Sequence, residues 1–296
     1  MPQFVSRRTS CRPPDTGGTT IGQRSRSVKR PVYLGSSVTA DARQPLLLLH
    51  AGVADSRMWD PIRPRLDRER RVLAPDLLGY GASPLPQGEY SDVDELVALL
   101  DRESVERTAV VGASFGGRIA IDLALSHPDR VAALVLAAPG LAGWDWSAET
   151  RAFGAEEDEL LEQGDVDGAV ELNVRTWVDG RSRGPDEVDP AVRSLVAVMQ
   201  RRAFELLLPA YAAEPQPEER MLEPPAATRL GELAAPTLIV VGDLDMPDFP
   251  RIADRIAAEA PNARVVTLNG VAHLPALERP ELFGELVLAY LHEVGA

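Results

Sequence analysis

Short apolar runs alternate with amphipathic stretches from residue 31 onward, and this alternation is the main structural signal of the chain. The apolar runs that read as strands lie at 45–50, 70–77, 108–114, 131–139, 236–243 and 264–270. Most are continuously apolar, as expected of strands that helices cover on both faces. Helical patterns separate or follow these runs, at 92–103, 116–127, 248–260 and 280–294. The alternation predicts an α/β fold with a mostly parallel central sheet and right-handed crossovers.

One region, residues 141–235, interrupts the alternation; we call it the helical insertion. It contains no convincing strand and shows three helical patterns, at 148–164, 167–178 and 190–211, before a Pro-rich connector. The insertion leaves from the carboxyl end of a strand, where α/β proteins place their ligand sites. We therefore expect a helical cap over a core formed by 31–140 and 236–296. Packing of these helices against the side of the sheet is the alternative.

Charge is distributed unevenly along a chain of otherwise ordinary globular composition, with 45% hydrophobic and 26% charged residues. Residues 1–30 hold seven basic and one acidic side chains, whereas the remainder holds 24 basic and 44 acidic ones. A body this acidic lacks the clustered positive charge that phosphate contacts need, so we expect no nucleic-acid partner. The sequence contains no run of about 18 apolar residues, so it does not predict a membrane span.

The basic segment 1–30 lacks hydrophobic periodicity, and we expect it to be disordered. Its Ser6–Arg8 hints at a twin-arginine signal, but no apolar stretch follows, and a misplaced start codon would also explain the segment. A cytoplasmic location is therefore the default expectation. The single cysteine, Cys11, cannot form an internal disulfide. Nothing in the sequence predicts the oligomeric state.

A serine between glycines, in Gly112-Ala113-Ser114-Phe115-Gly116, marks the end of a strand pattern and the start of a helical one. This is the G-x-S-x-G arrangement of a nucleophile elbow in the strand–turn–helix context that the motif requires. The turn needs a strained serine backbone and residues almost without side chains two positions away on either side. A helix-capping serine on a Gly-rich turn is the structural alternative.

A serine nucleophile needs a base, and the chain has four histidines. His127 lies 13 residues along the following helix, about 20 Å from Ser114 at 1.5 Å per residue, which is too far. His292 reads as a surface residue, and His50 as part of the turn after the first strand. His273 follows the last strand, at the same sheet edge as Ser114, so it is the expected base.

The base needs a carboxylate that fixes its tautomer and stabilises its protonated form. Of the three aspartates after the fifth strand, Asp245 lies at the tip of the loop and is the expected partner. Asp243, nearer the strand, is the fallback, and Asp248 reads as the N-cap of the next helix. The chain order Ser114, Asp245, His273 is that of α/β-hydrolase triads. A serine nucleophile that attacks a carbonyl group also needs N–H donors for the oxyanion that forms.

The segments that complete the picture are HAG (50–52) with Trp59, APDLLGYGAS (74–83), GASFGG (112–117), SHPDRVAALVLAAP (126–139), PTLIVVGDLD (236–245) and GVAHLPALERPE (270–281). From residue 31 to residue 296, the sequence resembles the α/β-hydrolase superfamily with a helical cap, in a branch similar to 3-oxoadipate enol-lactonases and esterases. The family more often has His-Gly where this chain has His50-Ala51, a departure that concerns the oxyanion amide.

The resemblance implies hydrolysis of a carboxylic ester or lactone of a small molecule through an acyl-serine intermediate. Ser114 would attack, His273 would carry the proton, and Asp245 would orient the imidazole. The amides of Gly52 and Phe115 would bind the oxyanion, and no metal or organic cofactor is required. Cleavage of a C–C bond, perhydrolysis, or a small-molecule receptor with slow turnover are the alternatives on the same fold.

The identity of the substrate stays open at this level. The helical insertion carries side chains that would either line an apolar pocket or pack in the core: Trp144, Trp146, Trp177, Met199 and Phe204. It also carries cations that would either hold a substrate carboxylate or lie on solvated helix faces: Arg175, Arg201 and Arg202.

Overall fold

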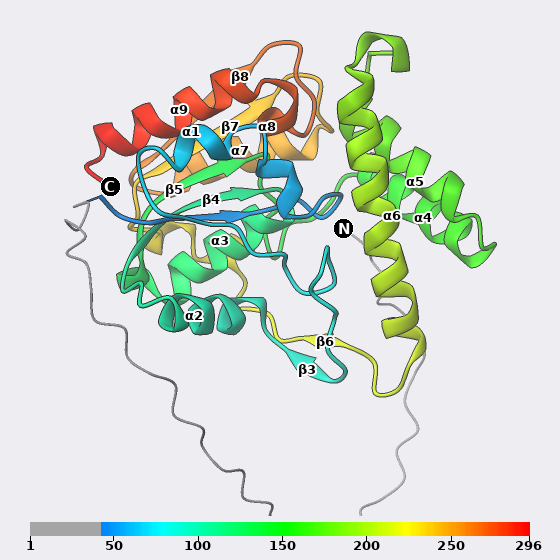
Figure 1. The fold of residues 1–296 in the computed structure, drawn as a ribbon, viewed down its shortest axis with the longest axis horizontal. Helices are drawn as coiled ribbons and strands as arrows, with labels where there is room; N and C mark the ends of the chain where they lie inside the picture. Colours follow the sequence, from blue (N-terminus) through cyan, green and yellow to red (C-terminus); the bar gives the residue numbers. More distant parts are fainter. Residues whose placement is uncertain (1–42) are drawn as a thin grey trace, which may run out of the picture.

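A six-stranded parallel sheet, in the order β2–β1–β4–β5–β7–β8, forms the centre of the molecule (Figure 1). The computed structural model describes residues 43–296, so the segment 1–30 and Cys11 lie outside the described residues. Every predicted strand is present: β1 (Leu46–Leu49), β2 (Val72–Leu73), β4 (Thr108–Ala113), β5 (Val131–Ala137), β7 (Thr237–Gly242) and β8 (Ala263–Leu268). The predicted α/β fold class is confirmed.

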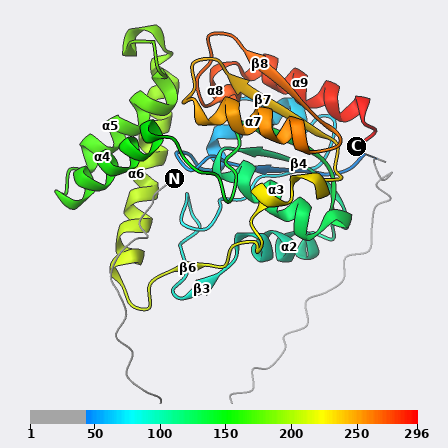
Figure 2. The same cartoon turned by 180° about the vertical axis from the view of Figure 1, so that it is seen from behind.

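Both faces of the sheet are buried under helices, which explains the continuously apolar strands. In β1, Leu46 and Leu48 belong to one apolar cluster and Leu47 and Leu49 to the other, and all four are fully buried. The helices on the first face are α1 (Arg63–Leu66), α8 (Pro275–Glu278) and α9 (Pro280–Glu293). Those on the second face, seen in Figure 2, are α2 (Asp92–Arg102), α3 (Phe115–Ser126) and α7 (Asp248–Glu259).

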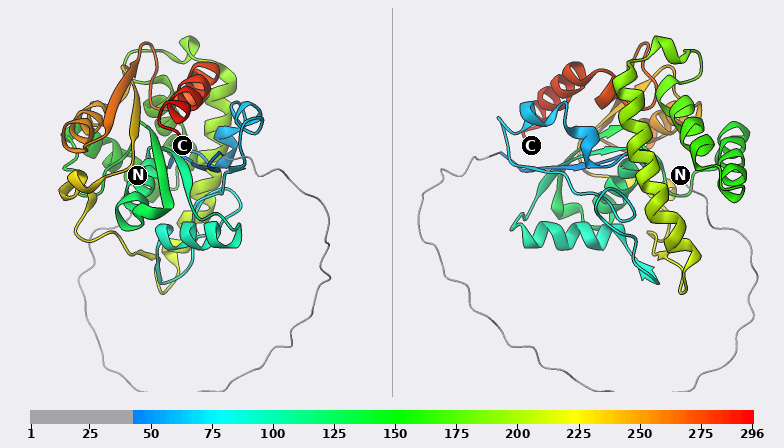
Figure 3. Two further views of the ribbon diagram at one scale, coloured as in Figure 1. Left: turned by 90° about the vertical axis from the view of Figure 1, so that its left-hand side faces the viewer. Right: turned by 45° about the vertical axis from the view of Figure 1, so that its right-hand side comes forward.

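The helical insertion forms a separate layer beyond the carboxyl ends of the strands (Figures 1 and 3). Its long helices are α4 (Ala148–Glu162), α5 (Val166–Val174) and α6 (Pro190–Ala212). A π-helical turn, η3 (Arg175–Asp179), continues α5. The short 3₁₀ turns of the insertion are η4 (Pro185–Glu187), η5 (Ala226–Thr228) and η6 (Leu230–Glu232). Within residues 43–296, no helix combines the length and apolarity needed to cross a bilayer.

The expectation that 141–235 holds no strand is wrong at one point. A two-residue strand, β6 (Glu218–Glu219), pairs in parallel with β3 (Glu89–Tyr90). A pair this short, made largely of charged residues, leaves no hydrophobic periodicity to read. The remaining short turns are η1 (Ser56–Trp59) and η2 (Pro128–Arg130).

Candidate active site

Ser114 occupies the turn between β4 and α3 in a backbone conformation that is rare for a residue with a side chain, φ 48° and ψ −107°. Strain of this kind costs about 1–3 kcal/mol and persists only where the surroundings enforce it. Here the Ser114 N–H donates to the carbonyl of Ala137, and its carbonyl accepts from the N–H of Gly140, both at 2.9 Å. The Ser114 side chain forms no capping bond with α3, so helix capping does not account for this serine.

The glycines around Ser114 allow strand and helix backbones to approach each other closely. A Cβ atom at Gly116 would lie 2.4 Å from the carbonyl oxygen of Leu49, and one at Gly112 would lie 2.6 Å from the carbonyl oxygen of Gly116. Real Cβ contacts are never this short, so a larger residue would require the backbone to move. This crowding is the physical reason for the spacing of the motif.

His273 follows β8, and its Nδ1 lies 2.8 Å from Oδ2 of Asp245. Both residues are only 2% exposed. The other carboxylate oxygen of Asp245 accepts the N–H of Met246 at 2.7 Å. Because an ionised carboxylate can only accept, Nδ1 of His273 carries the hydrogen, which leaves Nε2 as the basic nitrogen.

Asp243, the fallback partner, serves a different purpose. Its Oδ1 accepts the N–H of Gly270 at 2.7 Å, and its own N–H donates to the carbonyl of Leu268 at 3.1 Å. These bonds brace the segment that leads from β8 to His273. The histidine is therefore bonded to Asp245, while Asp243 holds the loop.

The sequence predicts Asp248 as the N-cap of α7, but in the structure Pro247 is the N-cap and Asp248 is the first helical residue. Its carboxylate faces the helical insertion and accepts from Trp144 Nε1 at 3.0 Å, Ser147 Oγ at 2.6 Å and Thr150 Oγ1. Burial alone would raise the pKa of Asp248, but the hydrogen bonds from Ser147, Thr150 and Trp144 outweigh it and hold the pKa below its ordinary value. The predicted capping role is wrong because the carboxylate instead accepts hydrogen bonds from donors about a hundred residues earlier in the chain.

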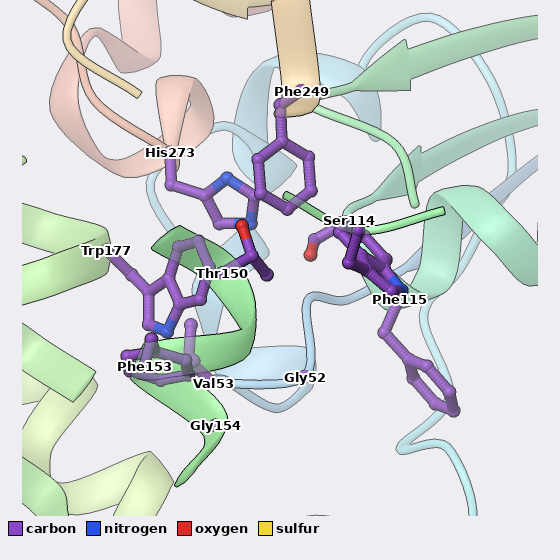
Figure 4. Close-up of a pocket in the computed structure, with 11 residues that line it drawn as sticks. Gly52, Val53, Ser114, Phe115, Thr150, Phe153, Gly154, Trp177, Phe249 and His273 are labelled. Atoms are coloured by element: carbon purple, nitrogen blue, oxygen red, sulfur yellow. The ribbon is translucent and has the colours of Figure 1, made fainter. Parts of the chain in front are cut away.

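Ser114 and His273 face a common pocket with a volume of about 40 Å³ (Figure 4). The core supplies Gly52, Val53, Ser114, Phe115, Phe249 and His273 to its lining, and the helical insertion supplies Trp146, Thr150, Phe153, Gly154 and Trp177. In Figure 4 the hydroxyl of Ser114 points toward the side of the pocket where His273 and Thr150 lie. No direct hydrogen bond joins Ser114 to His273 within the described residues; such bonds are often long in free enzymes and tighten on binding.

The amides expected to bind an oxyanion lie side by side at this pocket. A Cβ atom on Gly52 would be 3.4 Å from Cβ of Phe115. Phe115 is the first residue of α3, so its N–H has no acceptor within the helix. Neither N–H donates to a protein acceptor in residues 43–296. The N–H of Ala51, in contrast, donates to Sδ of Met58 at 3.3 Å, so Gly52 remains among the free amides of this turn.

His50 orders the turn that carries Gly52. Its Nε2 accepts the N–H of Leu77 at 2.9 Å, so its Nδ1 donates to the carbonyl of Ala51 at 2.8 Å. Burial lowers the pKa of His50, which keeps the ring neutral. Its carbonyl accepts the N–H of Gly116 at 3.1 Å, which ties this turn to the serine turn.

The sequence identified Trp177 as one of several candidate lining residues but did not predict that Trp177 and Phe249 pack on the histidine. The ring centroids of Trp177 and Phe249 lie 4.7 and 4.3 Å from that of His273. Trp177 belongs to the π-helical turn η3, a feature that often marks functional sites, and its carbonyl accepts the N–H of His273 at 3.3 Å. The aromatic enrichment of the insertion was visible in the sequence, but the π turn leaves no signal there.

A buried polar chain fixes Trp177 in this position. Its Nε1 donates to Oδ1 of Asn173 at 3.1 Å, and Nδ2 of Asn173 donates to Oε1 of Glu157 at 2.5 Å. Asn173 and Glu157 are 2% and 3% exposed. Buried polar groups are costly unless they are paired, so this pairing specifies the position of the indole.

The other candidates from the insertion lie away from the pocket. Met199 and Phe204 are buried in the apolar core. The three arginines form ion pairs at the protein surface: Arg175 with Glu156, Arg201 with Asp167, and Arg202 with Glu205. None of these five residues lines the pocket.

Comparisons with known proteins identify the family and the fold of the chain. The model of the alpha/beta hydrolase family matches residues 46–286. A 99-residue stretch is 43% identical to 2-hydroxymuconate semialdehyde hydrolase of Pseudomonas sp. (strain CF600), covering 31% of this chain and only 35% of that protein. Pimeloyl-[acyl-carrier protein] methyl ester esterase of Edwardsiella ictaluri (strain 93-146) is 28% identical over 81% of this chain and 90% of its own.

Among solved structures, the enol-lactonase from Burkholderia xenovorans LB400 has a TM-score of 0.68 at 21% identity, covering 84% of this chain and 92% of its own. At this identity the likeness shows a shared fold. The resemblance inferred from the sequence is therefore confirmed at the level of the superfamily, and the chain belongs to the alpha/beta hydrolase family.

Proposed function

We propose that this protein is a serine hydrolase that cleaves a carboxylic ester or lactone of a small molecule through an acyl-serine intermediate. The observation that carries the proposal is the pocket shared by Ser114 and His273, with Nδ1 of the histidine bonded to buried Asp245. An activated nucleophile requires a hydroxyl, a base beside it, and an acid that orients the base.

In the proposed reaction, Oγ of Ser114 attacks the carbonyl carbon while Nε2 of His273 takes the hydroxyl proton. The C–O bond then breaks, and the imidazolium returns the proton to the departing alkoxide. Water attacks the acyl-serine with the same nitrogen as base, which releases the acid and restores the hydroxyl. Asp245 stabilises the imidazolium at both stages, and the N–H groups of Gly52 and Phe115 bind the oxyanion.

C–C bond hydrolysis is the second candidate, since the local match to 2-hydroxymuconate semialdehyde hydrolase favours it. A muconate carries a carboxylate, and the pocket lining within the described residues includes no Lys or Arg. Burying an unpaired carboxylate is costly, so the composition of the pocket supports the ester or lactone over this alternative.

Labelling with a fluorophosphonate probe, read by intact mass, tests the nucleophile. We expect one adduct on the wild-type protein and on the control Ser126→Ala at the other end of α3, and none on Ser114→Ala with unchanged circular dichroism. An adduct on Ser114→Ala would exclude the assignment.

Turnover assays separate the alternatives. We expect multiple turnovers of p-nitrophenyl acetate and butyrate, and slower cleavage of a vinylogous diketone. Faster cleavage of the diketone would favour C–C hydrolysis, and release of a single equivalent of p-nitrophenol would favour a slow-turnover receptor.

A further inference from the structure

One face of α4 forms a wall of the pocket. Thr150, Phe153 and Gly154 are spaced i, i+3 and i+4, so they share one side of the helix. All three line the pocket together with Ser114 and His273 (Figure 4). A group bonded to Oγ of Ser114 would therefore share this pocket with that face of α4.

Gly154 has no structural reason to be glycine. Its φ is not positive, and a Cβ atom built on it would meet no heavy atom within 4 Å. The contrast with Gly116, where a Cβ atom would collide with backbone, is sharp. A glycine inside a helix is less favourable than alanine. A side chain at this lining position would therefore extend into open space.

The pocket lining within residues 43–296 contains no Asp, Glu, Lys or Arg. Besides Ser114, His273 and the α4 face, it is formed by Gly52, Val53, Phe115, Trp146, Trp177 and Phe249. The hydroxyl of Thr150 donates to Asp248, so this hydroxyl offers only its oxygen lone pairs to the pocket. Arg175, Arg201 and Arg202 are paired at the surface, so no cation of the described residues reaches the pocket to pair with a substrate carboxylate, whose burial without a partner is costly.

The pocket is also small. Its volume is about 40 Å³. This is well below the roughly 300–1,000 Å³ of typical small-molecule pockets, so the space favours a short acyl group. The acyl group stays bonded to Ser114 through both steps of an acyl-serine reaction, whereas the alcohol departs before water attacks. The α4 wall is thus placed to hold the acyl group.

We propose, on the basis of the serine hydrolase function above, that the substrates are esters of short, uncharged, apolar carboxylic acids, and that Gly154 sets the largest acyl group accepted. A side chain at position 154 would narrow the space that is open to the acyl chain. Gly154 is accordingly the residue that determines acyl size.

A series of p-nitrophenyl esters with one leaving group tests the proposal by kcat/KM. For the wild-type protein we expect butyrate to exceed octanoate, and to exceed the mono-ester of succinate, similar in length but charged, by about a hundredfold or more. Gly154→Leu should lose at least about tenfold more activity on butyrate than on acetate, and Gly154→Ala should show a smaller shift in the same direction. Ala155→Leu, on the exposed side of α4, is the matched control and should keep the wild-type profile.

The outcomes are distinguishable. An unchanged butyrate-to-acetate ratio in both Gly154 variants, with fluorophosphonate labelling retained, would overturn the role of Gly154 and leave the serine hydrolase intact. If the Gly154 variants instead change the preference among alkyl acetates that differ in their alcohol, the α4 wall contacts the leaving group and not the acyl group. Absence of labelling and of ester turnover in the wild-type protein would overturn both proposals.

Discussion

The hydroxyl of Thr150 donates a hydrogen bond to the carboxylate of Asp248, and this bond joins the first turn of α4 to the first turn of α7. The same carboxylate accepts from Ser147 and Trp144. Thr150 and Phe249, the neighbour of Asp248, both line the pocket. One core carboxylate therefore sets the position of the α4 wall relative to the histidine.

Replacing this carboxylate should weaken both the fold and the binding of substrate. Asp248→Ala leaves the donors of Trp144, Ser147 and Thr150 without an acceptor, for which we expect a loss of about 1–3 kcal/mol in the free energy of unfolding. We also expect a higher KM for p-nitrophenyl butyrate. Urea denaturation and steady-state kinetics measure the two effects. Asp254→Ala, on the exposed side of α7, is the control, and equal stability of the two variants would contradict the role of Asp248.

The same substitution at Asp245 and at Asp243 distinguishes the two candidate partners of the histidine. Asp245→Asn should lower kcat on p-nitrophenyl acetate by on the order of 10³–10⁴, because the amide no longer fixes the Nδ1–H tautomer or stabilises the imidazolium. Asp243→Asn keeps an oxygen acceptor for the N–H of Gly270 and should retain most of the activity. The reverse pattern would transfer the role to Asp243.

The close approach at the serine turn predicts a strong response to one methyl group. Gly116→Ala places a Cβ atom 2.4 Å from a backbone oxygen, so we expect a loss of about 1–3 kcal/mol or more in stability and slower fluorophosphonate labelling. Gly154→Ala adds the same methyl group to open space inside a helix and should be neutral or slightly stabilising. Thermal unfolding compares the two, and equal midpoints would refute the steric argument.

A buried charge cluster behind α3 predicts a pH dependence of stability. Arg118 lies 2.6 Å from Glu219 and 3.8 Å from Asp92, which is 4% exposed. Burial, with the nearby carboxylate of Glu219, raises the pKa of Asp92 to about 7. The folded state therefore favours the protonated acid, and its contribution to stability is present below pH 3.8 and lost as the pH rises through about 7.

Replacing the carboxylic acid of Asp92 with an amide that does not titrate should remove this pH-dependent loss of stability. We expect Asp92→Asn to be more stable than the wild-type protein at pH 8, with the difference shrinking toward pH 5, in urea denaturation across that range. Asp94→Asn, at an exposed position of α2, should show no such trend. A stabilisation by Asp92→Asn that is larger at pH 5 than at pH 8 would contradict the raised pKa.

Local patterns predicted the sheet and the serine turn because their causes are local. Every residue of β1 faces a covering layer, so the strand is apolar throughout, and the glycines around Ser114 are forced by atoms within a few residues or one strand away. The choice of Asp245 for His273 relied on loop position alone. The partners of Asp248 lie about a hundred residues earlier, and the packing of Trp177 on His273 depends on a π turn, so neither left a readable pattern.

The base of this site is held from two sides, by Asp245 from the core and by the ring and carbonyl of Trp177 from the insertion. The insertion therefore cannot be exchanged as an independent cassette. A chimera that grafts the corresponding helices of a relative onto this core would have to bring along Trp177, Asn173 and Glu157, or its imidazole would lose one of its two supports.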